Sequence, residues 1–448
     1  MSPFLRSSLD RGVARLCRLL ARIYFHDVEV TGIERVPRGV PVIVVANHHN
    51  AILDSVLLFG FLPVRPRFLG TSTMWKNPLL LPFLWLGGVI PVQRHQDAAP
   101  ADNAQAFVRC HAALAAGGAI GIFPEGETHD DPNLLPLKTG AARIALEFAA
   151  QRGAPPRIVP VGLHYTRKDV FRSRALVAVG APLDAAPEAR AAAADGQAAA
   201  RALTLRIGEA LRAAAPDFAS WDEERLIARA AAVFARPGQD LPHAASLADR
   251  ADLQRRFAVG ARDLRSRLPG RVAALEQSLR AYERDREAAG LRDGQVASRY
   301  PLARAAAAGA RAAAVLALLA PLAVAGIVLN WVPYRLCGLL ARVTDERDVT
   351  ATYKLLGGFV LFPLFWAAEA GFAARFGGWR AGTAAVLAAP GLALAALAFD
   401  ETRAGLLSET RAFLLLRGGA RGLVARRAAL HAEIVALVDE HARGAGAA

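Results

Sequence analysis

A histidine pair and a nearby acidic residue lie in the segment Asn47-His48-His49-Asn50-Ala51-Ile52-Leu53-Asp54, directly after an apolar run at residues 42–46. Four residues separate His49 from Asp54. If Asp54 lies in the first turn of a helix, its carboxylate can curl back to one ring nitrogen of His49 and leave the other facing a substrate. Such a pair fixes the tautomer and raises the basicity of the imidazole, as a general base acting on a hydroxyl requires.

The same spacing also fits a helix-capping aspartate beside two packing histidines. The position after a buried strand favours the chemical interpretation, because loops at the carboxyl ends of strands border the crevice of α/β enzymes. Only His49 has the four-residue separation from Asp54. We therefore predict His49 and Asp54 as the catalytic residues and assign His48 to structure.

A second polar segment, Phe123-Pro124-Glu125-Gly126-Glu127-Thr128-His129, follows the apolar run at 120–123. A glycine-containing turn after a strand leaves backbone N–H groups free, and Lys138 adds positive charge near the start of a helix expected at 139–150. Glu125 can accept a hydrogen bond from a hydroxyl. We predict that Glu125, Gly126 and Lys138 bind a phosphate or a polyol; the alternative is an ordinary glycine turn with solvated charges.

A third candidate is Arg94, which ends the run Gly87-Gly88-Val89-Ile90-Pro91-Val92-Gln93-Arg94. Its guanidinium could hold a phosphate through two parallel hydrogen bonds, or it could simply mark the surface. The apolar stretch 79–92 before it is too short and too interrupted by proline and glycine to cross a membrane. It could dip into a lipid interface, line a groove for an acyl chain, or pack in the core.

The elements that must position these residues form an α/β pattern. Short apolar runs at 42–46, 120–123 and 158–162 are typical of buried strands, and residues 102–116 and 139–150 are typical of helices between them. We predict a mixed central sheet flanked by helices, followed by a helical region and C-terminal transmembrane helices.

The predicted organisation has five parts. Residues 1–26 form a basic amphipathic helix that could lie on a membrane or pack on its own domain. The others are a catalytic domain at 27–184, a helical accessory region at 185–300, a membrane region at 301–400 with spans near 312–334, 355–374 and 381–399, and a basic helical tail at 401–448.

The composition is unusually apolar for an ordinary soluble protein, so membrane segments are expected. The 448 residues are 54% apolar and only 21% charged, which excludes an intrinsically disordered chain. The net charge of +14 would suit anionic lipid or a phosphorylated substrate. Three scattered cysteines support neither a disulfide framework nor a thiolate metal site. No zinc-finger spacing or basic–aromatic run indicates nucleic acid, so we expect neither a nucleic-acid partner nor a metal.

Taken in order, NHHNAILD, GGVIPVQR, FPEGETHD and IVPVG resemble the four blocks of the glycerolipid acyltransferase family, which includes glycerol-3-phosphate and lysophosphatidic acid acyltransferases. The segment FPEGETHDDPNLLPLKTG and the His-x-Asn-Ala-x-Leu-Asp form of the first block look most like the fungal-type branch, which acylates glycerol 3-phosphate or dihydroxyacetone phosphate.

The resemblance implies roles for individual residues. His49 would be the general base and Asp54 its partner, Arg94 would belong to the second block, and Glu125 and Gly126 to the third. In the commonest third block Thr-Arg-Ser follows Pro-Glu-Gly, whereas Glu-Thr-His follows here. An expected arginine is therefore missing, and Lys138 or Arg94 would supply the phosphate contact.

From these features we predict a membrane-bound O-acyltransferase that moves an acyl chain from acyl-CoA or an acyl carrier protein to glycerol 3-phosphate or dihydroxyacetone phosphate, without a bound cofactor. A lysophosphatidate or other lysophospholipid acceptor is the alternative, and a non-catalytic lipid-binding scaffold is the alternative of another class. The expected location is the inner membrane, with the catalytic domain facing the cytoplasm. Arginines flank every apolar segment, so charge alone does not orient the spans.

Overall fold

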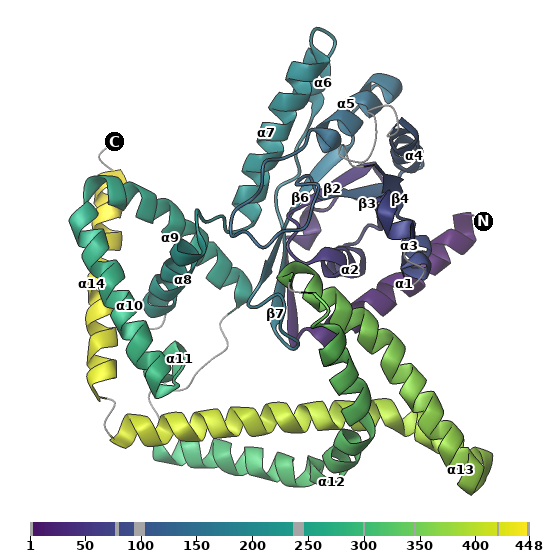
Figure 1. Ribbon diagram of the computed structural model, residues 1–448. Helices are drawn as coiled ribbons and strands as arrows, with labels where there is room; N and C mark the ends of the chain where they lie inside the picture. The colour runs from purple at the N-terminus through teal and green to yellow at the C-terminus, as the bar shows by residue number, and fades with distance from the viewer. Residues whose placement is uncertain are drawn as a thin grey trace. The chain divides into compact units, whose positions relative to one another are not determined.

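The chain folds into two compact units. The computed structural model describes residues 3–76, 80–93, 104–235, 246–298, 301–344, 346–418 and 421–445 (Figure 1). The first unit comprises Met1–Trp221 with two later segments, Ser246–Arg255 and Thr344–Thr352. The second comprises Asp222–Ala245, Arg256–Val343 and Tyr353–Ala448. The candidate site lies in the first unit.

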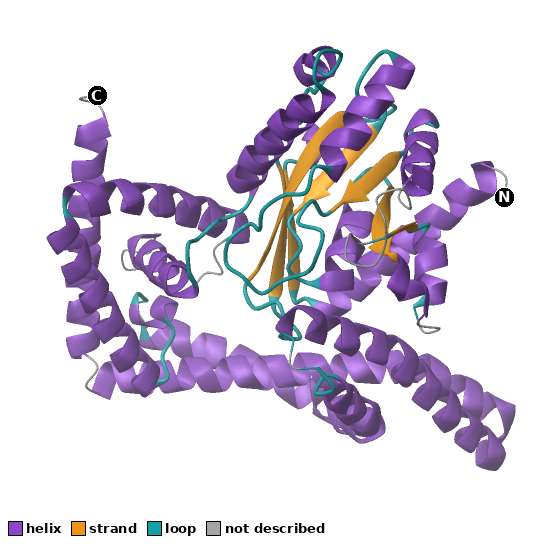
Figure 2. Cartoon of the chain, turned by 45° about the horizontal axis from the view of Figure 1, so that its top comes forward, coloured by secondary structure: helices purple, strands orange, loops and turns teal. Residues whose placement is uncertain are grey.

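A seven-stranded sheet with the order β1-β7-β6-β2-β5-β3-β4 forms the centre of the first unit (Figure 2). Every neighbouring pair is parallel except β6 and β7, which run antiparallel. The strands are β1 (Asp27–Thr31), β2 (Val42–Ala46), β3 (Pro66–Thr71), β4 (Ile90–Val92), β5 (Ala119–Ile122), β6 (Arg157–Tyr165) and β7 (Arg174–Val179). The predicted mixed sheet flanked by helices is therefore confirmed.

Burial explains why β2 is a continuous apolar run. All five of its residues are buried, because helices cover both faces of a parallel sheet. Side chains of a strand alternate between the faces, so Ile43 and Val45 enter one core together with Ile120 and Ile122 of β5. Residues of α4 (Ala104–Ala115), α5 (Gly140–Arg152) and α7 (Gly196–Ala214) complete that core.

The first unit extends beyond the predicted boundary at residue 184. Leu203, Ile207 and Leu211 of α7 are buried in the same core as the strands, so this helix belongs to the sheet domain. The short helix α6 (Ala186–Ala191) precedes it. The accessory region therefore begins near Trp221, because the apolar face of α7 has its partner in the sheet.

The N-terminal helix α1 (Pro3–Tyr24) packs on its own domain, one of the two alternatives that its sequence allows. Ala14, Ala21 and Tyr24 are buried, and the Arg18 guanidinium donates to the carbonyl oxygen of Gly60 in α2 (Ala51–Phe61). Helix α3 (Leu81–Gly87) follows β3, after the short 3-10 helix η2 (Ser72–Lys76). A second 3-10 turn, η1 (Ile33–Arg35), follows β1.

The second unit is helical. Helices α8 (Trp221–Ala235), α10 (Pro269–Ala289) and α14 (Arg421–Ala445), with the last part of α9 (Leu247–Arg267), share one apolar core. The short helix α11 (Asp293–Val296) contributes Val296 to this core. Arg427 of α14 is buried there, where its guanidinium pairs with Asp293 and donates to the carbonyl oxygen of Val233.

All three segments predicted to span a membrane are helical. Residues 312–334 lie in α12 (Leu302–Leu340), and residues 355–374 and 381–399 lie in α13 (Arg347–Gly418). Helix α13 has a non-helical break at Gly378, and a Cβ added at Gly382 would lie 2.9 Å from the carbonyl oxygen of Ala370. Two helices, Leu302–Leu340 and Val349–Gly418, are thus long and apolar enough to cross a membrane, and the second is bent into two arms.

Candidate active site

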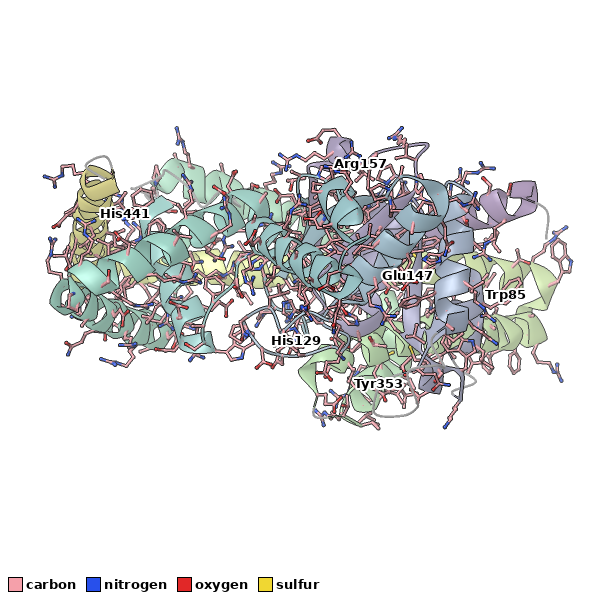
Figure 3. The ribbon with its side chains drawn as sticks, turned by 90° about the horizontal axis from the view of Figure 1, so that it is seen from above. Trp85, His129, Glu147, Arg157, Tyr353 and His441 are labelled. Atoms are coloured by element: carbon pink, nitrogen blue, oxygen red, sulfur yellow. The ribbon has the colours of Figure 1, made fainter. Side chains whose placement is uncertain are left out.

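Three loops meet at one edge of the sheet. Strand β2 pairs in parallel with both β5 and β6, so the carboxyl ends of these strands share one edge. The loops that leave them are residues 47–50, 123–139 and 166–173. Figure 3 shows His129, from the second loop, at one side of the first unit and Arg157, where β6 begins, at the opposite side.

His48 forms the histidine–carboxylate pair of this edge. Its Nδ1 lies 2.9 Å from Oδ2 of Asp54, whose side chain is completely buried. The backbone N–H of Asn50 also donates to Asp54 Oδ2 at 2.8 Å, and the Tyr165 hydroxyl donates to Oδ1. Because three donors converge on Asp54, its orientation is fixed, and it holds the hydrogen of His48 on Nδ1.

The other ring nitrogen of His48, Nε2, makes no hydrogen bond within the described ranges, and 16% of the side chain is exposed. The imidazole stacks on the ring of Phe123, with centroids 3.9 Å apart and an interplanar angle of 6°. Stacking fixes the plane of the ring and the Asp54 contact fixes its rotation. Nε2 is thereby left as the basic atom that can meet a substrate.

The predicted pairing of Asp54 with His49 is corrected by this geometry. Consecutive residues leaving a strand project to opposite sides, so only one of the two histidines can face Asp54. Between them and Asp54, Ala51 adopts a left-handed backbone conformation with φ 38° at the start of α2. This turn brings the first residues of α2 back toward His48. The four-residue separation between His49 and Asp54 therefore does not predict which histidine faces the carboxylate.

His49 lies beside the pair, half-buried, with its ring edge-to-face against His129 at a centroid distance of 4.6 Å. Burial, and more weakly the neighbouring His129, lowers the pKa of His49 to about 4. His49 is therefore neutral at physiological pH, and no carboxylate hydrogen bond to its ring is present among the described residues.

Glu125 occupies the interior of the second loop. Its Oε1 accepts the backbone N–H of His48 at 2.7 Å, and its Oε2 accepts from His129 Nε2 and, at 2.9 Å, from the backbone N–H of Leu135. The side chain has no exposed surface. Burial would raise the pKa of this carboxyl, but the hydrogen bonds from His129 and Leu135 outweigh it and lower the pKa. The carboxylate is thus engaged within the protein.

Gly126 and Lys138 lie together at this turn. Gly126 has φ +80°, and a Cβ added to it would meet Lys138 Nζ at 2.6 Å and Cδ at 2.7 Å. The Lys138 backbone N–H donates to the carbonyl oxygen of Pro124, which returns the end of the loop to its beginning. The exposed ammonium group therefore lies directly over the glycine turn.

Arg94 lies outside the described residues, since the structure describes the chain up to Gln93 and again from Ala104. The apolar stretch before it forms α3 and β4, with Leu84 and Ile90 buried and Trp85 exposed. Trp85 is labelled in Figure 3.

Four residues of this edge were missed by sequence reasoning: Asn47, His129, Tyr165 and Lys168. The Asn47 amide makes two hydrogen bonds with the backbone of Leu163, at 2.9 and 2.7 Å. Lys168 Nζ donates to the carbonyl oxygen of His129 at 2.9 Å and pairs with Asp130 at 2.8 Å. The available signal for two of them was position: Tyr165 ends and Lys168 follows the strand that the apolar run at 158–162 predicts.

Two observations bear on what else the site could hold. Oδ1 of Asn50 is buried and makes no hydrogen bond to any described residue, although Nδ2 donates to the carbonyl oxygen of Lys168. Unpaired buried acceptors are rare in proteins and require an explanation. Across the described ranges, no group of three or more histidine, cysteine or acidic side chains has the geometry of a metal site.

Comparison with known proteins finds one family model and several relatives that match the first part of the chain. Residues 27–164 match the family model described as Acyltransferase. Glycerol-3-phosphate O-acyltransferase 2 of Saccharomyces cerevisiae is 45% identical over 83 residues, which are 18% of this chain and 11% of the relative. Glycerol-3-phosphate O-acyltransferase 1 of the same yeast is 42% identical over 91 residues, 20% of this chain and 12% of the relative.

More distant relatives match longer stretches. The human 1-acyl-sn-glycerol-3-phosphate acyltransferase beta is 30% identical over 163 residues, 34% of this chain and 54% of the relative. The crystal structure of the 1-acyl-sn-glycerophosphate acyltransferase PlsC from Thermotoga maritima aligns with a TM-score of 0.37 and 19% identity, over 47% of this chain and 79% of that chain. The chain thus spans about a tenth of the yeast relatives and about half of the human one.

Proposed function

We propose that this chain, whose residues 27–164 match the family model described as Acyltransferase, transfers an acyl group from a thioester to a hydroxyl of glycerol 3-phosphate or dihydroxyacetone phosphate. The observation that carries the proposal is the His48–Asp54 pair at the carboxyl edge of the sheet, with one imidazole nitrogen held by Asp54 and the other without a hydrogen bond to any described residue. The similarity to two yeast glycerol-3-phosphate O-acyltransferases supports the choice of acceptor.

In the proposed mechanism, Nε2 of His48 removes the proton from the acceptor hydroxyl while the oxygen attacks the thioester carbonyl. Asp54 holds Nδ1–H and stabilises the imidazolium that forms. The new C–O ester bond replaces the C–S bond, and the departing thiolate takes the proton back from His48. No acyl-enzyme is needed in this sequence, so a serine or cysteine nucleophile is not part of it.

For the phosphate of the acceptor we propose Lys138, because its ammonium group lies over the Gly126 turn close to the strand ends. A cation beside a positive-φ glycine suits an anion, since the turn itself contributes N–H groups. Arg94 remains a second candidate from the sequence. Glu125, in contrast, already accepts three hydrogen bonds within the protein, so we propose that it positions the site and does not bind the acceptor.

A lysophosphatidate acceptor is the second candidate, favoured by the match to the human 1-acyl-sn-glycerol-3-phosphate acyltransferase beta. Both acceptors present a phosphate and a free hydroxyl, and the same base serves both. The exposed apolar side chains of α12 and α13, including Leu318, Phe372 and Leu387, support action at a membrane, where long acyl chains are found.

The test compares two single substitutions in the purified full-length protein. His48→Ala should lower the rate of labelled acyl transfer at least 100-fold, a loss typical of removing a general base. His49→Ala should remain within about 10-fold of wild type, because it lacks the carboxylate partner. A wild-type rate in His48→Ala, or an inactive His49→Ala beside an active His48→Ala, would refute the assignment.

The same assay identifies the substrates. Glycerol 3-phosphate, dihydroxyacetone phosphate and lysophosphatidate are offered in parallel, each with acyl-CoA and with acyl carrier protein as the donor. We expect the highest kcat/KM with one of the first two acceptors. A higher value with lysophosphatidate would select the second candidate, and no product with any pair would contradict the enzymatic function and favour a lipid-binding scaffold.

A further inference from the structure

The loop after β5 forms hydrogen bonds with both polar groups of the His48 main chain, its N–H and its C=O. Glu125 accepts the His48 N–H at 2.7 Å, and the His129 N–H donates to the His48 carbonyl oxygen with an N···O distance of 3.3 Å. His48 lies just beyond the end of β2, where strand pairing no longer satisfies its N–H and C=O groups. The loop therefore takes over the role of a neighbouring strand at the residue that carries the proposed base.

His129 closes this arrangement through its ring. The Asp131 N–H donates to His129 Nδ1 at 3.2 Å, so Nδ1 is an acceptor and the ring carries its hydrogen on Nε2. That hydrogen is donated to Glu125 Oε2, which also accepts the Leu135 N–H. The chain of contacts runs from Asp131 through His129 and Glu125 to the main chain of His48.

Both oxygens of the Glu125 carboxylate accept hydrogen bonds from the protein. The hydrogen bonds hold the pKa of Glu125 low in spite of burial, so the group is ionised and acceptor-only at neutral pH. The His129 side chain is itself only 7% exposed. Removing the Nε2–H donor would leave a buried charged oxygen short of a partner, a cost that drives rearrangement of the loop.

We propose that His129 is a positioning residue: through Glu125 it fixes the main chain of His48, and thereby the aim of the imidazole at the acceptor hydroxyl. This inference rests on the proposed function, since it assigns His48 as the base. The ring of His48 stacks on Phe123 and is hydrogen-bonded to Asp54 at the same time, so a small shift of its main chain would break one of these two contacts. Misplacement of a catalytic group by about 1 Å can cost on the order of 100-fold in rate.

The test exploits the different reach of two amides. In His129→Gln, the side-chain nitrogen occupies the place of Nε2 and can still donate to Glu125. In His129→Asn, the nitrogen lies near the place of Nδ1 and falls short. We expect kcat of the Gln variant to stay within about 3-fold of wild type, and kcat of the Asn variant to fall about 10- to 100-fold, with KM for the acceptor unchanged within about 3-fold.

Glu125→Gln provides a second measurement, because an amide nitrogen must then replace one of two oxygens that both face donors. We expect a similar loss in kcat, and little further loss when His129→Asn is added, since both changes break the same chain of contacts. The melting temperature of every variant is measured alongside, and the comparison of Gln with Asn at position 129 is made between folded proteins.

Equal activity of the Gln and Asn variants, or a loss confined to KM for the acceptor, would overturn the inference. Its failure is distinct from failure of the proposed function. If His48→Ala is inactive while both His129 variants behave alike, the base stands and His129 does not position it. If His48→Ala transfers acyl groups at the wild-type rate, the proposed function itself is wrong.

Discussion

His48 and His49 are adjacent in the chain, yet their surroundings give them different chemistry. His48 has a buried carboxylate on one nitrogen and none of the described residues on the other, the arrangement that a general base needs. His49 is held neutral by burial and faces His129. At this scale, the environment of a ring, and not its distance along the sequence from an aspartate, decides its role.

The burial of His49 predicts how the stability of the protein changes with pH. An unfolded histidine takes up a proton near pH 6.5, whereas folded His49 does so only near pH 4. As the pH falls from 6.5 to 4, the unfolded state therefore binds more protons and the free energy of unfolding decreases, by at most about 3 kcal/mol from this residue. His49→Asn should show a shallower fall of melting temperature over this range.

The control for this experiment is His26→Asn, which changes an exposed histidine. The pKa of His164 is also lowered to about 4, chiefly by burial. The wild type and both variants therefore keep the pH dependence of stability that His164 contributes. Identical slopes for wild type and His49→Asn, measured by thermal denaturation between pH 7 and 4.5, would contradict the lowered pKa of His49.

At the scale of elements, one glutamate ties a remote segment to the sheet. The Glu29 carboxylate of β1 accepts from the Ser246 hydroxyl and from the backbone N–H groups of Leu247, at 2.6 Å, and Ala248, at 3.2 Å. These N–H groups open α9 and have no partner within that helix. Glu29 therefore caps α9 from another element, which places Ser246–Arg255 in the first unit.

We predict that Glu29→Ala lowers the free energy of unfolding by about 1–2 kcal/mol, as the loss of a helix cap does. Amide hydrogens at the start of α9 should exchange faster with solvent, measured by hydrogen exchange and mass spectrometry. Glu34→Ala is the matched control, because Glu34 has a 73% exposed side chain. Unchanged exchange at the start of α9 in Glu29→Ala would show that the cap contributes nothing.

At the scale of the whole molecule, small residues let the long apolar helices of the second unit approach closely. A Cβ added at Gly326 of α12 would lie 2.1 Å from the carbonyl oxygen of Leu392 in α13. Near this crossing, Trp366 Nε1 donates to Asn330 Oδ1 at 2.8 Å, and Asn330 Nδ2 donates to the carbonyl oxygen of Gly326 at 2.9 Å. Small residues and a polar pair together hold apolar helices in one register.

Gly326→Ala should therefore destabilise the helical unit by about 1–3 kcal/mol, since the backbone of α13 must move to admit the methyl group. Thermal unfolding in detergent measures the effect. Gly309→Ala, in the same helix and with no atom within 4 Å of an added Cβ, should be neutral or slightly stabilising. Equal melting temperatures for the two variants would contradict the close crossing.

The sequence alone determined the α/β architecture, the strands at 42–46, 120–123 and 158–162, the long apolar helices, and the two loops where the polar site residues gather. These features follow from apolar runs and turn residues that are local in the chain, so burial and turn chemistry dictate them before any long-range contact forms. The role of α7 in the sheet core escaped sequence analysis, because an amphipathic helix does not reveal which surface it covers.

Only the tertiary structure decided which histidine faces Asp54. Tyr165 and Glu125 reach this region from other strand ends, and Thr352 accepts the N–H of Ile52 at 3.4 Å from 300 residues downstream. The orientation of each ring depends on donors and acceptors that the packing of the sheet and its helices brings together. Residue spacing within a single segment cannot predict these contacts. The left-handed backbone of Ala51 likewise lies between Asn50 and Ile52, whose N–H groups donate to Asp54 and Thr352.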